Sequence, residues 1–440
     1  MASLYKKPIV VRDSKTGKRV KKKSAKWWGR FTDALGREKR VPLATDRRAA
    51  QVMLQELIHK VERQKAGLHD PIEEQMCRPL DEHLTDFVTY LRAKDVTERH
   101  VGETVMQIRK IVETGRWRTA GDIEAGGVAK FLSAFRAKGR AAQTYNHYLK
   151  SIKHFTGWLE REGRIVRNPI AHMPRLNVKA DRRHDRRALS ADEFQRLIKE
   201  AQDGPPIEGI SGLDRAMIYL IAAWTGFRKG EIGSLTIQSF DLESEVCTAT
   251  VAAAFSKRRR EDTQFLHPYV VGKLRVWLKT RGEVEPDELL FPISARAGVT
   301  VTRPDGTVYY RRQDRAKSKG NRKALPPVPD RKTHVMMRKD LAAARRAWIA
   351  EAEGDKKEHR RRQRSDFLTY CNHAGLYADF HSNRHLFITN LERAGIRPKM
   401  AQTLARHSDV RLTMDVYTHV DREEQIDAIR KLRAPGDEAA

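Results

Sequence analysis

Residues 381–391 read His-Ser-Asn-Arg-His-Leu-Phe-Ile-Thr-Asn-Leu, a polar start that passes into an apolar run. The spacing of the apolar side chains predicts a helix that begins at the polar segment. His381 and Arg384 are three residues apart, so one turn of that helix brings both side chains to the same face. An imidazole can exchange a proton and a guanidinium can hold two phosphate oxygens, which predicts a phosphate site at the start of this helix.

The same segment admits a second interpretation, a metal site. His381 and His385 are four residues apart, a spacing at which two imidazoles can bind one ion. The glutamate of the zinc-protease pattern is missing, and no paired cysteines lie near in the sequence. We therefore favour the phosphate interpretation and predict no metal and no cofactor.

A second segment, Thr-Gly-Phe-Arg-Lys-Gly-Glu-Ile at 225–232, follows an apolar helix predicted over 217–224. Arg228 would therefore leave a buried helix at a glycine turn, with Glu231 three residues on. A guanidinium stays charged and binds phosphate oxygens in two places, which suits stabilisation of a pentavalent phosphorus. Taken alone, an arginine at such a turn is more often an ordinary surface residue.

A third segment, Phe-Ser-Lys-Arg-Arg-Arg-Glu-Asp at 255–262, falls at the tip of a β-hairpin predicted over 246–270. Lys257 can there reach a phosphate and protonate a departing oxygen as general acid. A solvated hairpin turn is the alternative interpretation, because three arginines follow the lysine directly.

A fourth segment, residues 404–420, reads Leu-Ala-Arg-His-Ser-Asp-Val-Arg-Leu-Thr-Met-Asp-Val-Tyr-Thr-His-Val. It places Tyr417 ten residues after His407. A phenol with its ordinary pKa near 10 is a poor nucleophile, so it needs cationic neighbours and an aligned phosphate. An isolated tyrosine is usually a core or surface residue, and the prediction that Tyr417 attacks a phosphate depends on the other three segments.

The order Arg, Lys, His-x-x-Arg, His, Tyr resembles the tyrosine recombinase, or phage integrase, family. Six catalytic positions occur in the family's order, in TGFRKGEI, FSKRRRED with LHP after it, HSNRH, and ARHSDVRLTMDVYTHV. The resemblance implies an enzyme of site-specific DNA recombination, in integration or excision, that cleaves and rejoins strands through a 3′-phosphotyrosyl intermediate. It assigns the phosphate clamp to Arg228 and Arg384, the general acid to Lys257, assistance in proton transfer to His381 and His407, a bracing role to Glu231, and the nucleophile to Tyr417.

Two features depart from the family's pattern. Arg406 stands where the family usually has a glycine, directly before the second histidine. Residues 293–365 look like an insertion between the hairpin and HSNRH that the catalytic pattern does not explain.

The fold class expected from the whole sequence is mainly α with small β elements, in three domains. Residues 1–72 predict a three-stranded sheet, with strands at 9–11, 26–31 and 38–43, and a helix over 45–65. Residues 78–176 predict a helical bundle with amphipathic stretches near 80–93, 98–113, 122–138 and 142–162. Residues 188–440 predict a mixed, mostly α catalytic domain, whose first helix starts at a capping box, Ser190 to Glu193. The resemblance makes the first segment an arm-type DNA-binding module and the second a core-binding domain.

The charge of the chain points to a polyanionic partner. Its formal net charge is +29 and its pI about 10.1. Residues 1–72 hold 19 Lys and Arg against 7 Asp and Glu, and residues 293–365 hold 21 against 8. Two separated basic blocks on an otherwise near-neutral chain favour double-stranded DNA over a merely solvated surface.

Other features narrow the setting of the protein. The three cysteines are far apart, and no apolar run approaches the roughly 20 residues that cross a bilayer. We expect a cytoplasmic protein without membrane contact, associated with the nucleoid when bound to DNA, and the resemblance implies a homo-oligomer, a tetramer, on DNA. Two alternatives stay open: relaxation of DNA in the manner of a type IB topoisomerase, and a DNA-binding accessory protein that does not cleave.

Overall fold

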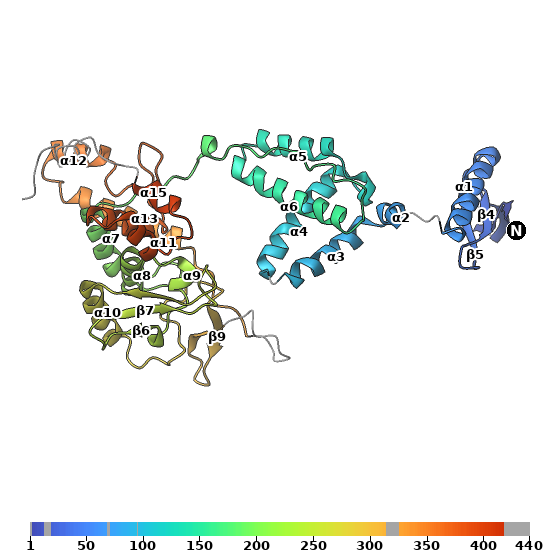
Figure 1. Cartoon of the computed structure of the whole chain (residues 1–440). Coiled ribbons are helices and arrows are strands. Elements are labelled where there is room, and N and C mark those ends of the chain that lie inside the picture. The colour runs from blue at the N-terminus through green and yellow to red at the C-terminus, as the bar shows by residue number, and fades with distance from the viewer. Residues whose placement is uncertain (1, 13–18, 68–70, 95, 314–324, 418–440) are drawn as a thin grey trace, which may run out of the picture. The chain divides into compact units, whose positions relative to one another are not determined.

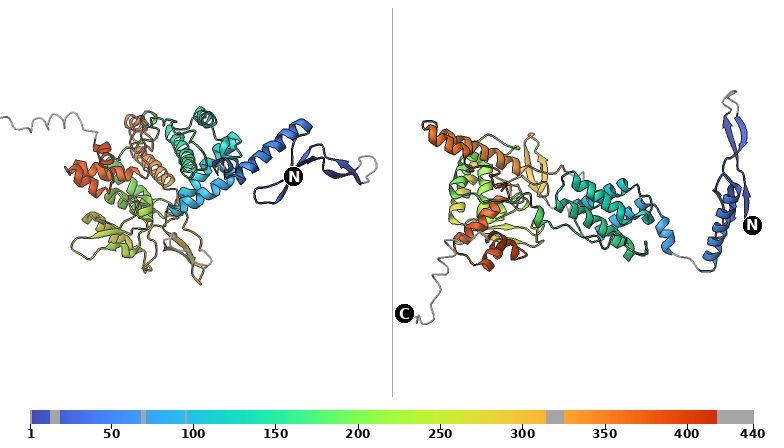
Figure 2. Two further views of the ribbon diagram at one scale, coloured as in Figure 1. Left: turned by 45° about the vertical axis from the view of Figure 1, so that its right-hand side comes forward. Right: turned by 90° about the horizontal axis from the view of Figure 1, so that it is seen from above.

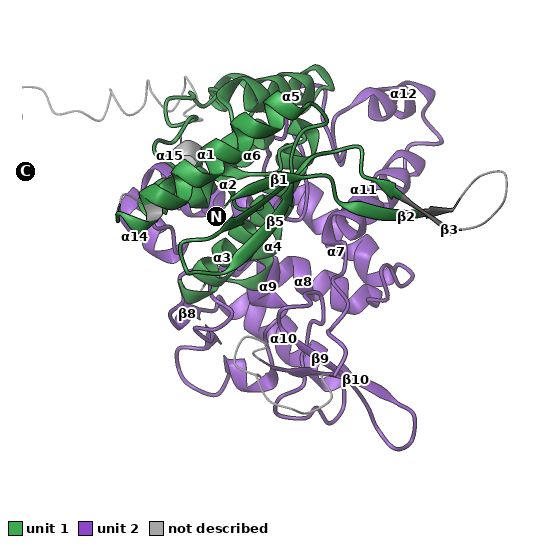
Figure 3. Ribbon diagram, turned by 90° about the vertical axis from the view of Figure 1, so that its right-hand side faces the viewer, with its two compact units in different colours: residues 1–181 green, residues 182–440 purple. Residues whose placement is uncertain are grey.

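The computed structural model describes residues 2–12, 19–67, 71–94, 96–313 and 325–417. The chain divides into two compact units, residues 1–181 and residues 182–440 (Figure 3). Both are built from helices with small sheets, which confirms the predicted fold class (Figure 1). Within the described ranges, no helix combines the length and the apolar character that a membrane span requires.

The first unit begins with a small antiparallel sheet and a helix, as predicted, but one strand of the sheet differs. The sheet consists of β1 (Ser3–Tyr5), β4 (Trp28–Thr32) and β5 (Glu38–Pro42), and α1 (Arg47–Lys65) contacts it. The strand predicted at 9–11 instead belongs to β2 (Pro8–Arg12), which pairs only with β3 (Arg19–Lys23) in a separate hairpin (Figure 2). β3 was not predicted, because Arg-Val-Lys-Lys-Lys lacks the alternation of apolar and polar residues that is typical of a strand.

The rest of the first unit is a helical bundle that matches the four predicted helices. After the short α2 (Pro71–Cys77) come α3 (Leu80–Ala93), α4 (Glu98–Gly115), α5 (Ala125–Ala137) and α6 (Ala142–Arg161), with a 3₁₀ turn at Ala120–Asp122. Aromatic rings fill the core: Phe87 lies 5.2 Å from Phe155 and 5.3 Å from Trp158, between ring centroids. These aromatic side chains therefore stabilise the bundle and are not available to a ligand.

The second unit is organised around α8 (Gly212–Thr225), a helix that is buried over most of its surface. Its neighbours include α7 (Ala191–Asp203), α10 (Pro268–Thr280) and α13 (Ser382–Arg393). The predicted capping box opens α7, since the Ser190 hydroxyl accepts from the Glu193 backbone and the Glu193 carboxylate accepts from the Ser190 backbone. The predicted helix at 217–224 is thus the centre of the second unit.

A three-stranded sheet of β6 (Phe240–Asp241), β7 (Thr248–Val251) and β8 (Asp262–Phe265) lies beside these helices. β7 and β8 form the predicted hairpin, which is shorter than the predicted 246–270. Its last residues belong to α10 instead, because Pro268 occupies the first turn of that helix, a position that suits proline.

The basic block at 293–365 contains structure of two kinds. β9 (Gly298–Thr302) and β10 (Val308–Arg312) pair as a hairpin, and α12 (Lys356–Arg364) buries none of its residues. In contrast, α11 (Thr333–Ala350) packs on α7 and puts Met336, Met337 and Leu341 into the core. Part of the block is therefore integral to the unit, and the exposed α12 carries six Lys and Arg against one Glu.

The chain ends, as far as it is described, in the helices that hold the second half of the predicted site. After α13 come α14 (Pro398–Leu404) and α15 (Arg411–Tyr417), and both contact α13. Short 3₁₀ turns at Lys179–Asp181 and Ile237–Ser239 complete the elements, together with α9 (Lys229–Ile232).

Candidate active site

A tight turn at the end of α8 brings the first predicted segment to α13. Gly226 has φ 63°, in the left-handed region, and its nearest neighbour outside the turn is the Phe387 ring of α13. A Cβ atom at position 226 would lie 2.6 Å from Phe387 Cδ1, which is shorter than real contacts. Glycine is required here for its conformation and for the close approach, and the turn then presents Arg228 at the start of α9.

Arg228 and Glu231 interact as the sequence predicts. The Arg228 backbone N–H donates to Glu231 Oε2 over 2.9 Å, and Arg228 Nη1 donates to Glu231 Oε1 over 2.9 Å. The Glu231 side chain is only 3% exposed, whereas that of Arg228 is 25% exposed. A buried carboxylate therefore holds an arginine that still reaches solvent, where a phosphate can approach.

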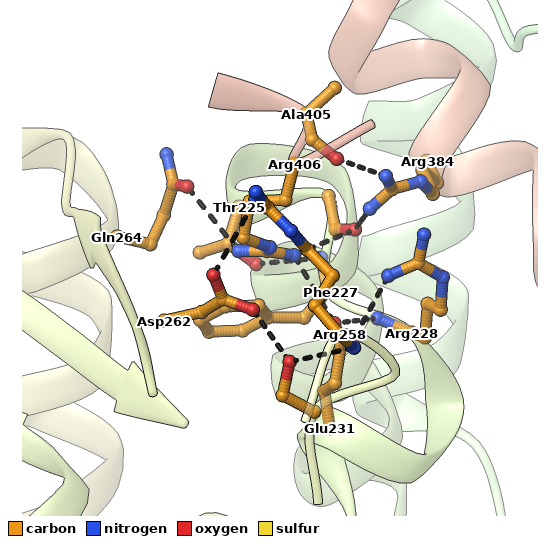
Figure 4. Close-up of polar contacts among 12 residues, drawn as sticks. Thr225, Phe227, Arg228, Glu231, Arg258, Asp262, Gln264, Arg384, Ala405 and Arg406 are labelled. Atoms are coloured by element: carbon orange, nitrogen blue, oxygen red, sulfur yellow. Dashed lines mark hydrogen bonds and ion pairs between the residues drawn. The ribbon is translucent and has the colours of Figure 1, made fainter. Parts of the chain in front are cut away.

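Arg384, from α13, lies buried against the same turn (Figure 4). Its Nη1 donates to the Gly226 carbonyl and its Nη2 to the Ala405 carbonyl, at the C-terminal ends of α8 and α14. The partial negative charge at helix C-termini favours a cation in this position. Burial, followed by the nearby charges of Arg228 and Arg406, lowers the pKa of Arg384 to about 9, so the guanidinium remains charged at neutral pH.

Asp379 fixes the backbone from which His381 projects. Its Oδ1 accepts from the backbone N–H groups of His381, at 2.9 Å, and Ser382, at 3.2 Å. The same carboxylate accepts from His184 Nε2 and Arg186 Nε, each at 2.9 Å, and these ion pairs and hydrogen bonds outweigh burial and lower its pKa. The start of α13 is thus attached to the segment that enters the second unit.

His381 lies at the surface of the site and His385 lies deeper. Atoms packed around the His381 ring, together with the positive charge of Arg186, lower its pKa, although contact with water on its exposed side moderates the effect. Burial lowers the pKa of His385 to about 4. Both imidazoles are therefore uncharged at neutral pH. Among the residues that the structure describes, no group of three His, Cys, Asp or Glu side chains could hold a metal ion.

His407 follows a strained turn after α14. Arg406 directly before it has φ 52°, a left-handed conformation, and its side chain is 4% exposed. His407 Nδ1 lies 2.9 Å from Thr413 Oγ1 of α15, a hydrogen bond that sets the orientation of the ring. Burial and then the charge of Arg384 lower the pKa of His407 to about 4.

Lys257 occupies the exposed loop between β7 and β8, as predicted for the hairpin tip. Asp262 anchors this loop, because its Oδ2 accepts from Ser256 Oγ over 2.6 Å and its Oδ1 lies 3.7 Å from Arg258 Nη1. β8, which follows the loop, bonds to the site through Gln264 and Arg406, and Lys257 itself is exposed.

Tyr417 is the last residue of α15, whose helix packs on α13. Its side chain lies outside the described part of the chain, so its distance to the arginines stays a prediction. The structure thus brings together Arg228, Glu231, Arg384, His381 and His407. Lys257 lies on the loop between β7 and β8, and the Tyr417 backbone ends α15, which packs on α13.

Two contributors to the site escaped sequence reasoning. Arg406 ion-pairs with Glu231, Nη2 to Oε2 at 3.2 Å, across 175 residues of sequence, and Asp379 binds Arg186 across 193. The departure from glycine at position 406 was a signal, but it could not reveal the partner. Arg228, Arg384 and Arg406, with Glu231 among them, are called the arginine cluster below.

Comparisons with known proteins identify the family and the fold of the chain. The model of the phage integrase family matches residues 187–424, more than half of the chain. A tyrosine recombinase XerC of Xylella fastidiosa is 26% identical over 221 residues, which is 48% of this chain and 71% of that protein. Among solved structures, a lambda integrase dimer bound to a COC′ core site has a TM-score of 0.51 at 17% identity, covering 90% of this chain and 94% of that one. A lambda integrase tetramer bound to a Holliday junction has a TM-score of 0.50 at 16% identity, covering 88% and 92%.

Proposed function

Because the chain belongs to the phage integrase family, and is a tyrosine recombinase for site-specific DNA recombination, we propose that it cuts and rejoins DNA strands through a covalent bond to Tyr417. The observation that carries the proposal is the arginine cluster. Arg228 and Arg406 both bind the Glu231 carboxylate, and Arg384 donates to the Gly226 carbonyl that Arg406 also contacts, so the cluster holds three positive charges against one negative charge. A buried excess of positive charge is costly unless an anion completes it, and a scissile phosphate is such an anion.

The proposed cleavage step balances without any cofactor. The Tyr417 phenol oxygen attacks the phosphorus, the bond from phosphorus to the 5′ oxygen breaks, and a 3′-phosphotyrosyl bond forms. The phenol loses one proton and the departing 5′ oxygen gains one, so the net products are the covalent adduct and a free 5′ hydroxyl. Rejoining reverses the step when a 5′ hydroxyl of the partner strand attacks the adduct.

The charged residues divide this work between them. Arg228 and Arg384 neutralise the charge that grows on the non-bridging oxygens in the transition state. Lys257 protonates the 5′ oxygen once its loop closes on DNA. His381 and His407 are uncharged in the free protein, so each can accept a proton or donate a hydrogen bond to the phosphate.

The partner of this site is double-stranded DNA. Recombination joins strands of two duplexes, so several copies of the chain must act together, and the protein forms oligomers on DNA; we propose a tetramer.

The bundle, residues 78–176, then acts as a core-binding domain, and residues 1–72 act as an arm-type module whose Lys and Arg contact phosphates. Removal of residues 1–72 should lower the slope of DNA affinity against salt concentration, and an unchanged slope would contradict that role. Work on DNA places the protein in the cytoplasm, at the nucleoid.

A suicide substrate tests the covalent chemistry. It is a duplex of the recombination site with a nick just 3′ of the cleaved phosphate, so that the short product diffuses away and the adduct accumulates. The native protein should form a denaturation-resistant adduct, and Tyr417→Phe should form none. Tyr269→Phe is the matched control, because Tyr269 is an exposed tyrosine of α10.

The outcomes separate the possible activities. An adduct that persists in Tyr417→Phe would overturn the nucleophile assignment. Site-independent relaxation of supercoiled DNA would indicate a topoisomerase, and binding without any adduct would indicate an accessory protein.

A further inference from the structure

Arg406 lies inside the arginine cluster but takes no part in the proposed chemistry. Its φ of 52° belongs to the left-handed region, which glycine adopts freely and other residues rarely do. Its guanidinium is nevertheless buried, with the side chain 4% exposed. A residue that combines an unfavourable backbone with a buried charge needs strong contacts to hold it there.

Those contacts join three segments of the unit (Figure 4). Arg406 Nη2 donates to Glu231 Oε2 over 3.2 Å and to the Gly226 carbonyl over 3.3 Å. Arg406 Nη1 donates to Gln264 Oε1 of β8 over 3.3 Å. The guanidinium also lies 4.4 Å from the centroid of the Phe227 ring, within cation–π range.

The Glu231 carboxylate is held from two sides as a result. Oε1 accepts from Arg228 Nη1, and Oε2 accepts from the Arg228 backbone and from Arg406. The carboxylate cannot rotate without losing one of these bonds. Since Arg228 is partly exposed and its side chain has several rotamers, a fixed carboxylate is what restricts it to one position.

Electrostatics give Arg406 a second effect on the same carboxylate. Without Arg406, Arg228 would be the one remaining ion-pair partner of Glu231 among the described residues. The buried side of the carboxylate would then face no positive charge from Arg406. Arg406 Nε has no hydrogen-bond partner in the described part of the chain, so the residue is not fully satisfied by its present contacts. The position is therefore maintained for the cluster and at some cost to local stability.

We infer that Arg406 is a positioning residue of the reaction, which acts through the Glu231 carboxylate to hold Arg228 where the scissile phosphate binds. The inference rests on the proposed function, since it presupposes that Arg228 neutralises that phosphate. A rival route runs through Gln264 and β8 to the loop of Lys257, and it would make Arg406 a support of the general acid.

Three variants separate these roles. Arg406→Gly keeps the left-handed turn, which glycine adopts freely, and removes the guanidinium, while Glu231 keeps Arg228 as its partner. Arg406→Lys keeps the charge but cannot bond Glu231 and Gln264 together, and it should restore part of the rate. Arg411→Gln is the matched control, since it removes an exposed positive charge from α15, where the side chain is 86% exposed.

The measurement is single-turnover cleavage of the suicide substrate at saturating protein, with melting temperatures as a check on folding. On an ordinary phosphate, Arg406→Gly should cleave about 10- to 100-fold more slowly than the native chain, as expected when a catalytic group is misplaced. The comparison is then repeated on two altered substrates. A methylphosphonate removes the charge of the scissile phosphate, and a bridging sulfur at the 5′ position leaves without needing a proton.

If Arg406 acts through Arg228, the methylphosphonate should remove most of the difference between Arg406→Gly and the native chain, as it should for Arg228→Ala. The bridging sulfur should leave the difference unchanged. Rescue by the sulfur substrate instead, an equal loss on all three substrates, or no loss at all would each overturn the inference. Failure of the proposed function has another signature, which is that the native chain forms no Tyr417-dependent adduct on the ordinary phosphate.

Discussion

Two arginine sites of the second unit, Arg215 with Asp340 and the arginine cluster, differ in how their charge is balanced. Arg215 on α8 is fully buried, and its Nε and Nη2 donate to the two oxygens of Asp340 on α11, each over 2.9 Å. Its remaining donors reach the carbonyls of Pro205, Ile210 and Ala201, and Tyr219 donates to the same carboxylate over 2.8 Å. All five N–H groups of this arginine have partners, and its charge is neutralised.

In the arginine cluster, the positive charges are not all neutralised and not every N–H group has a partner among the described residues. Arg384 is almost as deeply buried as Arg215, but among the described residues its two hydrogen bonds go to backbone carbonyls and to no carboxylate. Glu231 serves Arg228 and Arg406, and Arg406 keeps an unpaired Nε. Burial alone thus does not distinguish a structural arginine from a functional one. Under the proposed function the balance of charge does, because the arginine cluster has an excess of positive charge that an anionic ligand would neutralise.

The largest change in the free energy of unfolding is expected at the ion pair of Arg215 and Asp340. Arg215→Ala leaves the Asp340 carboxylate buried without its cation, so the free energy of unfolding should fall by about 3–5 kcal/mol. Denaturant unfolding of the full chain measures it. The double variant Arg215→Met with Asp340→Leu is the control, since it leaves no unpaired charge and should recover most of the loss. A single variant as stable as the native chain would show that the pair is not structural.

Arg384→Ala should give the converse result. It removes a charge that no carboxylate neutralises, so the free energy of unfolding should change by only about 1 kcal/mol, the cost of two carbonyls that water can then reach. Single-turnover cleavage should nevertheless fall by about 10²–10³-fold, as when one donor to a developing oxyanion is lost. Loss of folding comparable with that of Arg215→Ala would place Arg384 in the structural class instead.

The sequence alone predicted those interactions whose residues lie close together in the chain. His381 and Arg384 share a helix turn, Glu231 follows Arg228 by three residues, and Ser190 caps α7 with Glu193, so each pair could be predicted from spacing. Helices with a regular apolar face, such as those of the bundle, were found for the same reason.

The long-range pairs could not be predicted from one sequence. Arg215 and Asp340 are 125 residues apart, and Glu231 and Arg406 are 175 apart, so only the folded chain shows which arginine a carboxylate neutralises. β1 and β3 were missed for another reason. One has three residues, and the other is lysine-rich, so neither has the pattern of a half-buried strand.

The smallest expected effect is the change in the free energy of unfolding with pH, which arises from two buried histidines near the arginine cluster. Burial lowers the pKa values of His385 and His407 to about 4, below the value near 6.5 of an unfolded histidine. Between these values the unfolded chain binds more protons than the folded one, so this stability is complete above pH 6.5 and is lost as the pH falls towards 4. Protonation is opposed because it would add charge to a cluster that is already positive.

Between pH 6.5 and 5.5, the free energy of unfolding should fall by roughly 1 kcal/mol for each of these histidines. Unfolding of the native chain and of His385→Gln with His407→Gln at both pH values measures it, and the variant should lose most of the slope. Binding of DNA should reverse the sign, because the negative charge of the scissile phosphate favours protonated histidines, so that binding takes up protons and strengthens as the pH falls. An affinity that does not change with pH over this range would mean that the bound phosphate does not reach these histidines.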